Sequence, residues 1–211
     1  MHLLLVAAAL FSAPSTPFAS PAAAADAAQA PTPATAPSAA VRVPVHPNST
    51  CPIMGKPISL KLFTDTELGR IWVCCKGCIK DIHDDVELAY RTAYPTAREV
   101  QLDKCPVTGR ELREQSPFVE LQGLRFRVFD DAAAQLARTR TQITVARVLE
   151  PKLVEVGNAT CPIDGKPVSP NAFAVIDGRI VGLSSPKHVE ELSKDPAVAL
   201  RRALASVERA R

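Results

Sequence analysis

Apolar and polar positions along the chain follow the same order three times: two short β-like runs, then a segment with helical period. In the first repeat the runs span 58–63 and 70–74, around a polar loop at 64–69. Apolar residues then recur at intervals of three and four residues, which indicates an amphipathic helix. Those helical positions are Ile79, Ile82, Val86, Ala89 and Ala93.

The second and third repeats carry shorter turns between their runs. Gln122-Gly123 and Asp177-Gly178 each separate two apolar runs, and Asp-Gly in such a place is a strong signal for a β-hairpin. The runs span 117–121 and 124–129 in the second repeat, and 172–176 and 179–183 in the third. Helical positions follow at Ala133, Leu136 and Ala137, and at Val189, Leu192, Val198, Leu204 and Val207 with a break at Asp195-Pro196.

A six-residue turn motif precedes each pair of runs. It reads Cys51-Pro-Ile-Met-Gly-Lys, Cys105-Pro-Val-Thr-Gly-Arg and Cys161-Pro-Ile-Asp-Gly-Lys, with starts 54 and 56 residues apart. A repeat of this period indicates one supersecondary unit per copy, and its Pro and Gly favour a tight turn. The sequence therefore predicts an α+β fold of three tandem ββα modules (turn, hairpin, helix), at 48–100, 101–150 and 151–211.

Modules of this size need help to fold. About fifty residues cannot bury a large core, so a metal ion, a disulfide or a neighbouring module must contribute to stability. The sequence leaves open whether the three modules form one compact domain or are loosely joined.

The N-terminal part is predicted to be a signal and a linker. Residues 1–25 have the character of a secretory signal, because an apolar run at 3–11 precedes the small residues Ala23-Ala24-Ala25. That run is too short to cross a bilayer, so we expect no membrane span. Residues 26–47 are rich in Pro and Ala and are predicted to form a disordered linker. We therefore expect an exported protein, periplasmic or extracellular.

Charge and motif content favour a binding protein over an enzyme. The net charge is +3, with acidic and basic residues interspersed and only one Trp and two Tyr, so no nucleic-acid partner is expected. The sequence contains no nucleophile elbow, phosphate-binding glycine loop or zincin motif. We therefore predict no enzymatic activity.

Thiols are concentrated in the first module. Cys51 lies 23 positions before Cys74, and Cys74 lies four before Cys78. Thiolates are soft ligands that suit Zn²⁺ and Cu(I), and the first turn of a helix, where Cys78 is expected, lowers the pKa of a thiol. We predict one Zn or Cu(I) ion per chain. The candidates for a fourth ligand are Cys75, Met54, His83 and water.

Oxidation is the alternative, because exported proteins with six cysteines commonly form disulfides. The candidate pairs are Cys51 with Cys74 or Cys78, and Cys105 with Cys161. Such a chain would be a disulfide-stabilised, non-catalytic interaction module. A weaker alternative is a thiol–disulfide oxidoreductase with a reversible Cys74–Cys78 or Cys75–Cys78 bond.

The residues of the first module resemble a known family. Cys51-Pro-Ile-Met-Gly-Lys followed by Trp72-Val73-Cys74-Cys75-Lys76-Gly77-Cys78 is similar to the TRASH and YHS domains, small cysteine modules linked to heavy-metal sensing, trafficking and resistance. The resemblance covers residues 50–94. It implies that Cys51, Cys74 and Cys78 are metal thiolates, and that Cys75 supports them or is a spare ligand. It also implies a role in metal handling or tolerance, with an unidentified protein partner in metal trafficking.

The other two modules keep only parts of this site. In the third, Ser184 and His188 stand 23 and 27 positions after Cys161, where the first module has thiols. Cys161, Asp164 and His188 could form a weak metal site, although a retained scaffold is the simpler expectation. In the second, Cys105 has no such companions and is expected to pack in the core.

Two further pairs of positions match between repeats. Trp72 and Phe126 occupy equivalent strand positions and are expected in the core. Asn48 and Asn158 begin two Asn-x-Thr glycosylation sequons directly before the Cys-Pro turns. A role in the turn explains this placement without a sugar.

Overall fold

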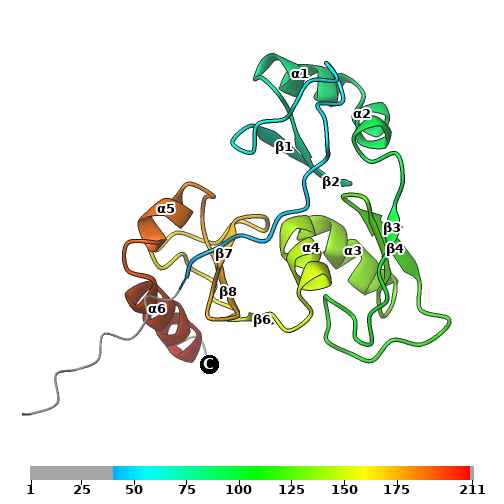
Figure 1. Ribbon diagram of the computed structural model, residues 1–211. Coiled ribbons are helices and arrows are strands. Elements are labelled where there is room, and N and C mark those ends of the chain that lie inside the picture. The colour runs from blue at the N-terminus through cyan, green and yellow to red at the C-terminus, as the bar shows by residue number, and fades with distance from the viewer. Residues whose placement is uncertain (1–39, 210–211) are drawn as a thin grey trace, which may run out of the picture. The chain divides into compact units, whose positions relative to one another are not determined.

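The computed structural model describes residues 40–209 as a mixed α+β structure with six helices and three small β-sheets. The predicted α+β class is thus confirmed for these residues. Each of three antiparallel hairpins is followed in the chain by two helices (Figure 1). The predicted signal at 1–25 and the predicted linker as far as residue 39 lie outside the described residues.

The first hairpin pairs in a different register from the predicted one. Its elements are β1 (Phe63–Thr66), β2 (Gly69–Trp72), α1 (Gly77–Asp84) and α2 (Val86–Ala93). Phe63 lies opposite Trp72 and Thr66 lies opposite Gly69, so most of the predicted loop is strand. Asp65, one of the polar residues that suggested a loop, pairs across the hairpin with Arg70, whose Nε donates to Asp65 Oδ1 at 2.7 Å.

The single helix predicted after this hairpin is divided in two. Asp85 lies between α1 and α2, and its carboxylate accepts a hydrogen bond from the backbone N–H of Leu88 at 3.0 Å. Asp is a favoured N-cap residue because its side chain satisfies a free backbone donor at the helix start. The chain therefore ends α1 and begins a second helix at Asp85.

The second hairpin forms around Gln122 and Gly123, as predicted. Its elements are β3 (Arg98–Glu99), β4 (Phe118–Leu121), β5 (Leu124–Arg127), α3 (Asp131–Thr139) and α4 (Thr141–Leu149). β3 is a short parallel strand beside β5, so the second sheet begins before residue 101. α4 has no counterpart in the prediction, because its buried residues occupy nearly every position and leave no helical period to read.

The third hairpin forms around Asp177 and Gly178, also as predicted. Its elements are β6 (Val154–Glu155), β7 (Phe173–Ile176), β8 (Arg179–Gly182), α5 (His188–Leu192) and α6 (Pro196–Arg209). β6 pairs parallel to β8, which repeats the arrangement of β3 and β5. The predicted break at Asp195-Pro196 is confirmed, since α6 begins at Pro196.

Residues 40–47 of the predicted linker lie extended against the third hairpin. Arg42 and Val175 exchange two backbone hydrogen bonds, at 2.8 and 3.2 Å. Val41 and Val43 pack against two core clusters. The alternation of valines in this segment, a strand-like period, explains the ordered contact better than its proline content does.

The second and third repeats share part of their core. Ile143 and Ala146 of α4 form one apolar cluster with Phe173, Val175 and other residues of the third hairpin. Residues 40–209 all lie within one compact unit.

One buried side chain also links the first and second hairpins. Gln122 is fully buried at the tip of the second hairpin, where its Oε1 accepts from the backbone N–H of Arg70 at 3.0 Å. The same oxygen accepts from Gln142 Nε2 at 2.8 Å, and Gln122 Nε2 donates to the carbonyl of His46 at 2.9 Å. A buried amide that is bonded through both its oxygen and its nitrogen connects these segments directly.

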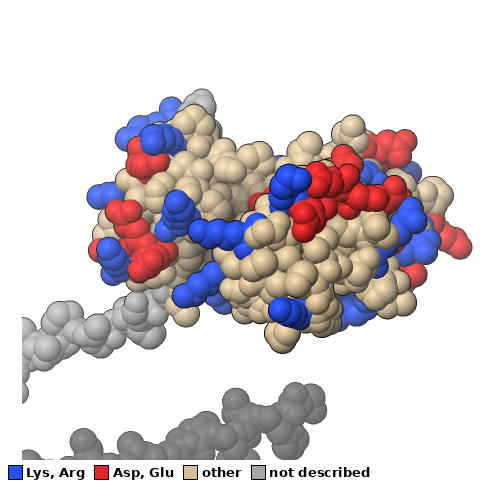
Figure 2. All heavy atoms as spheres, turned by 90° about the horizontal axis from the view of Figure 1, so that it is seen from above, with Lys and Arg blue, Asp and Glu red and all other residues tan. Residues whose placement is uncertain are grey.

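The face of the molecule shown in Figure 2 carries both signs of charge. Lys and Arg side chains lie at several places on it, and the largest group of Asp and Glu side chains lies towards the upper right of the view. Among residues 40–209, no helix has both the length and the apolar composition needed to cross a membrane.

Candidate metal centre

The Cys51 turn is closed by two backbone hydrogen bonds. The N–H of Cys51 donates to the carbonyl of Lys56 at 2.8 Å, and the N–H of Gly55 donates to the carbonyl of Cys51 at 2.8 Å. Gly55 has φ +65°, a conformation that glycine adopts without steric cost. The turn presents the Cys51 side chain to the interior, where it is 1% exposed.

Asn48 attaches this turn to the second strand. Its Oδ1 accepts from the backbone N–H of Trp72 at 2.8 Å, and its Nδ2 donates to the carbonyls of Trp72 and Thr50 at 3.0 and 2.7 Å. The residue is 3% exposed. The expected turn role of Asn48 is therefore confirmed, and its amide has no space for a glycan in this structure.

Cys74 and Cys78 bring two more sulfurs to Cys51. Cys74 lies two residues after β2, and Cys78 lies in the first turn of α1. Their Sγ atoms are 3.8 Å apart, and the three Sγ atoms lie within 4.8 Å of one another. A tetrahedral ion with Zn–S distances of about 2.3 Å requires sulfurs about 3.8 Å apart. The three thiols thus converge as the ligands of one ion would.

Cys75 lies beside this cluster without belonging to it. Its Sγ is 3.5 Å from that of Cys78, but it is not among the three sulfurs that mutually converge, and its side chain is exposed. Cys75 and Cys78 are separated by two residues, a Cys-x-x-Cys spacing that is readable in the sequence. Of the other fourth-ligand candidates, His83 Nε2 is hydrogen-bonded to Thr64 Oγ1 at 3.1 Å, and Met54 is 53% exposed.

The thiols of the cluster differ in acidity. Burial raises the pKa of Cys78, and hydrogen bonds from it to neighbouring sulfurs raise it further. Burial also raises the pKa of Cys74, together with a bond to Cys51. At Cys51 burial is outweighed by backbone N–H donors, first that of Cys74 and then that of Met54, which lower the pKa to about 7. A cluster with one thiolate and two protonated thiols must release two protons when a metal binds to all three sulfurs.

No disulfide is formed among the six cysteines, all of which lie in the described residues. The Cys74–Cys78 and Cys75–Cys78 sulfurs, at 3.8 and 3.5 Å, are beyond the S–S bond length of about 2.05 Å. Cys105 and Cys161 are buried in separate core clusters, so the predicted pairing between them is not formed.

The third repeat forms a second group of potential ligands. Cys161, Asp164 and His188 bring a sulfur, a carboxylate oxygen and a ring nitrogen within 4.8 Å of one another. Ser184 lies among them and donates to Asp164 at 3.0 and 3.1 Å. Desolvation acts to raise the pKa of Asp164, but bonds from the Lys166 N–H and the Ser184 hydroxyl leave it below its usual value.

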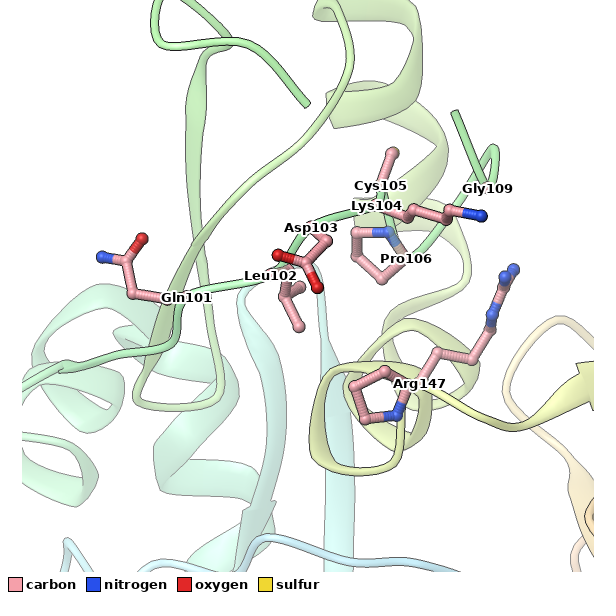
Figure 3. A pocket seen from close by; sticks show the side chains of 9 residues that line it. Gln101, Leu102, Asp103, Lys104, Cys105, Pro106, Gly109 and Arg147 are labelled. Carbon is pink, nitrogen blue, oxygen red and sulfur yellow. The ribbon is translucent and has the colours of Figure 1, made fainter. Parts of the chain in front are cut away.

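The second repeat has the same turn and no ligand cluster. The N–H of Cys105 donates to the Arg110 carbonyl at 2.8 Å, and the side chain packs in an apolar core cluster that includes Val128. A cavity of about 260 Å³ opens beside it, bordered by side chains that include Asp103, Lys104 and Arg147 (Figure 3). Both metal-ligand groups found among residues 40–209 exclude Cys105, and its predicted packing role is confirmed.

The large aromatic residues also lie where the repeat predicts them. Trp72 is 1% exposed and Phe126 is fully buried. Trp72 is bonded through both of its backbone polar groups to Asn48, so the core of the first hairpin and the Cys51 turn are directly connected.

Comparisons of the chain with protein-family models, curated proteins and solved structures found no match. The resemblance to the TRASH and YHS domains thus stands on the residues quoted above. What the structure adds is a convergent cluster of Cys51, Cys74 and Cys78 that could hold a metal ion.

Proposed function

We propose that this chain is an exported heavy-metal-binding protein whose site is formed by Cys51, Cys74 and Cys78. The observation that carries the proposal is the convergence of three unpaired thiols, from a turn, a strand end and a helix start, within 4.8 Å. Three sulfurs suit a soft or borderline ion such as Cu(I) or Zn²⁺. The sequence resemblance to TRASH and YHS domains supports a role in metal handling or tolerance.

The proposal includes the modular organisation. In this proposal each repeat is one unit of a turn, a hairpin and two helices, and only the first keeps a full set of thiols. The identical closing bonds of the turns at Cys51, Cys105 and Cys161 support a common origin for the three units. The predicted signal at 1–25 supports export, and we assign no catalytic step to the chain.

A metal ion held by these thiols would be accessible from one side. Cys51 and Cys78 are buried, but Cys74 is partly exposed and Cys75 is exposed. Cu(I) would be complete with the three thiolates, whereas Zn²⁺ would take Cys75 or a water as its fourth ligand. An exposed spare thiol favours exchange of the ion with a partner protein over permanent storage.

A second candidate function is thiol–disulfide exchange, in which Cys75 and Cys78 form a disulfide while a substrate disulfide is reduced to two thiols. It is favoured by their Cys-x-x-Cys spacing, by the 3.5 Å between the sulfurs, and by the exposure of Cys75 beside a buried partner. Exposed low-pKa thiols next to a resolving cysteine are typical of redox sites. Oxidation of this pair would remove Cys78 from the metal cluster, so the two functions exclude each other at any one moment.

Matched cysteine variants test the proposal. Cys51→Ser removes a sulfur of the cluster, and Cys105→Ser removes an equally buried sulfur from the same turn in the second repeat. Titration of the reduced full chain with Cu(I) against a competing chelator should show one tight site in the wild type and in Cys105→Ser. Cys51→Ser should lose it. Equal Cu(I) binding in all three proteins would refute the assignment.

A further inference from the structure

The third repeat replaces two thiols of the first site by harder donors at the same positions. Cys161 keeps the turn sulfur, Ser184 stands where the strand-end thiol stood, and His188 stands where the helix thiol stood. Asp164, at the position of Met54, adds a carboxylate from the turn itself. The result is one soft donor with one nitrogen and one carboxylate oxygen.

The geometry of this group matches metal coordination. Cys161 Sγ lies 3.5 Å from His188 Nδ1. For a tetrahedral Zn²⁺ with bonds of about 2.3 Å to sulfur and about 2.0–2.1 Å to nitrogen, the two ligand atoms would be about 3.5–3.6 Å apart. The Asp164 carboxylate completes a triangle of three atoms within 4.8 Å, which is the donor count of an open zinc site.

The frame that holds these donors is as well ordered as that of the first site. Asn158 is buried and bonds to the backbone of Gly182 and to the carbonyl of Thr160, as Asn48 does in the first repeat. The N–H of Cys161 donates to the Lys166 carbonyl at 2.8 Å. Repeat three has thus kept the support for ligands while changing their chemistry.

We infer that Cys161, Asp164 and His188 form a second metal site, selective for a borderline divalent cation such as Zn²⁺ over Cu(I). Nitrogen and carboxylate ligands suit Zn²⁺, whereas Cu(I) prefers thiolates. The Ser184 hydroxyl, bonded to the Asp164 carboxylate, positions that ligand. Three protein ligands leave one position for water or for an exogenous ligand.

The competing interaction at this site is weak. Lys166 Nζ lies 3.8 Å from Asp164 Oδ2, and the lysine side chain is 76% exposed. An ion pair with so exposed a lysine is weak, so it does not prevent Asp164 from binding a cation. This site is independent of the first one, because the two share no residue.

The number of zinc ions bound per reduced full chain tests this inference. In Cys74→Ser/Cys78→Ser, which removes the first site, we expect one equivalent of Zn²⁺ to remain. Adding His188→Ala should remove it, with a loss of affinity larger than the roughly 10–100-fold cost of losing an outer partner. His188 is only partly buried, so this change should leave the fold intact, as circular dichroism can verify.

Cobalt substitution gives an independent readout. Co²⁺ bound to the Cys74→Ser/Cys78→Ser protein should show a thiolate-to-metal charge-transfer band that Cys161→Ser abolishes and Cys105→Ser retains. Failure of Cys74→Ser/Cys78→Ser to bind Zn²⁺ or to show this band would overturn the second site. If the wild type binds no more Zn²⁺ than Cys74→Ser/Cys78→Ser does, and His188→Ala removes that Zn²⁺, only the first site would be overturned.

Discussion

Replacing Asn48 by Ala tests how the fold positions the first site. The change removes three hydrogen bonds and leaves the backbone N–H and C=O of Trp72 and the carbonyl of Thr50 without this partner. Unsatisfied buried groups cost about 1–3 kcal/mol each, and carbonyls recover part of that cost, so we expect about 2–4 kcal/mol of lost stability. In a unit of this size that corresponds to a decrease in Tm of about 4–16 °C.

The same change should weaken metal binding. Asn48 holds the Cys51 turn against the strand that leads to Cys74, as an outer hydrogen-bond partner holds a metal ligand. Loss of such partners typically costs 10–100-fold in affinity, so we expect a decrease of about that size at the first site. Chelator competition measures the affinity, and fluorescence of Trp72, the single tryptophan, follows unfolding of the first hairpin.

Asn158→Ala is the matched control. This residue makes the equivalent three bonds in the third repeat, to Gly182 and Thr160. It should cost a similar amount of stability and leave Cu(I) affinity at the first site unchanged. If Asn48→Ala and Asn158→Ala have the same effect on that affinity, or neither has any, then Asn48 does not position Cys51.

Three further predictions concern the thiols and the core. Metal addition to the reduced protein near pH 7 should release about two protons, because the raised pKa values keep Cys74 and Cys78 protonated until a metal binds. Metal affinity should therefore fall as the pH is lowered. A titration in weak buffer measures the proton release, and no release would contradict the prediction. In metal-free protein Cys75 should be alkylated first, because its side chain is exposed and a hydrogen bond from the Cys78 N–H lowers its pKa. Mass spectrometry identifies the labelled cysteine, and labelling of Cys51 before Cys75 would refute the prediction. Gln122→Ala should cost about 2–4 kcal/mol by chemical denaturation, because it leaves three partners unpaired, two of them buried and one part-buried. A cost below about 1 kcal/mol would mean that the hairpin tip repacks.

The elements set by local chemistry were predictable from the sequence. The hairpins around Gln122-Gly123 and Asp177-Gly178 form where predicted, because two-residue turns fix the register of both strands. The first hairpin was not predictable in register, because Asp65 is a strand residue paired with Arg70 and its polarity suggested a loop.

Features that depend on contacts distant in sequence could not be predicted in this way. α4 is buried on almost all sides, and its buried residues include the polar Thr141, Gln142 and Thr144. Its apolar residues alone therefore show no helical period in the sequence. The two-residue strands β3 and β6 exist only because a hairpin edge is available for them.

The candidate metal site was also predictable only in part. The spacing of Cys51, Cys74 and Cys78 indicated one cluster, and the structure brings those three sulfurs together. The spacing did not show that Cys75 would lie outside the cluster, because that depends on how the chain bends between β2 and α1.

Elemental analysis of the mature chain, purified anaerobically without added reductant, tests the central claim most directly when free thiols are counted on the same sample. The account predicts bound zinc or copper together with six free thiols after the metal is removed, and loss of one equivalent in Cys51→Ser but not in Cys105→Ser. A metal-free protein with fewer than six thiols before reduction would contradict it, and would make the cysteines structural or redox-active instead.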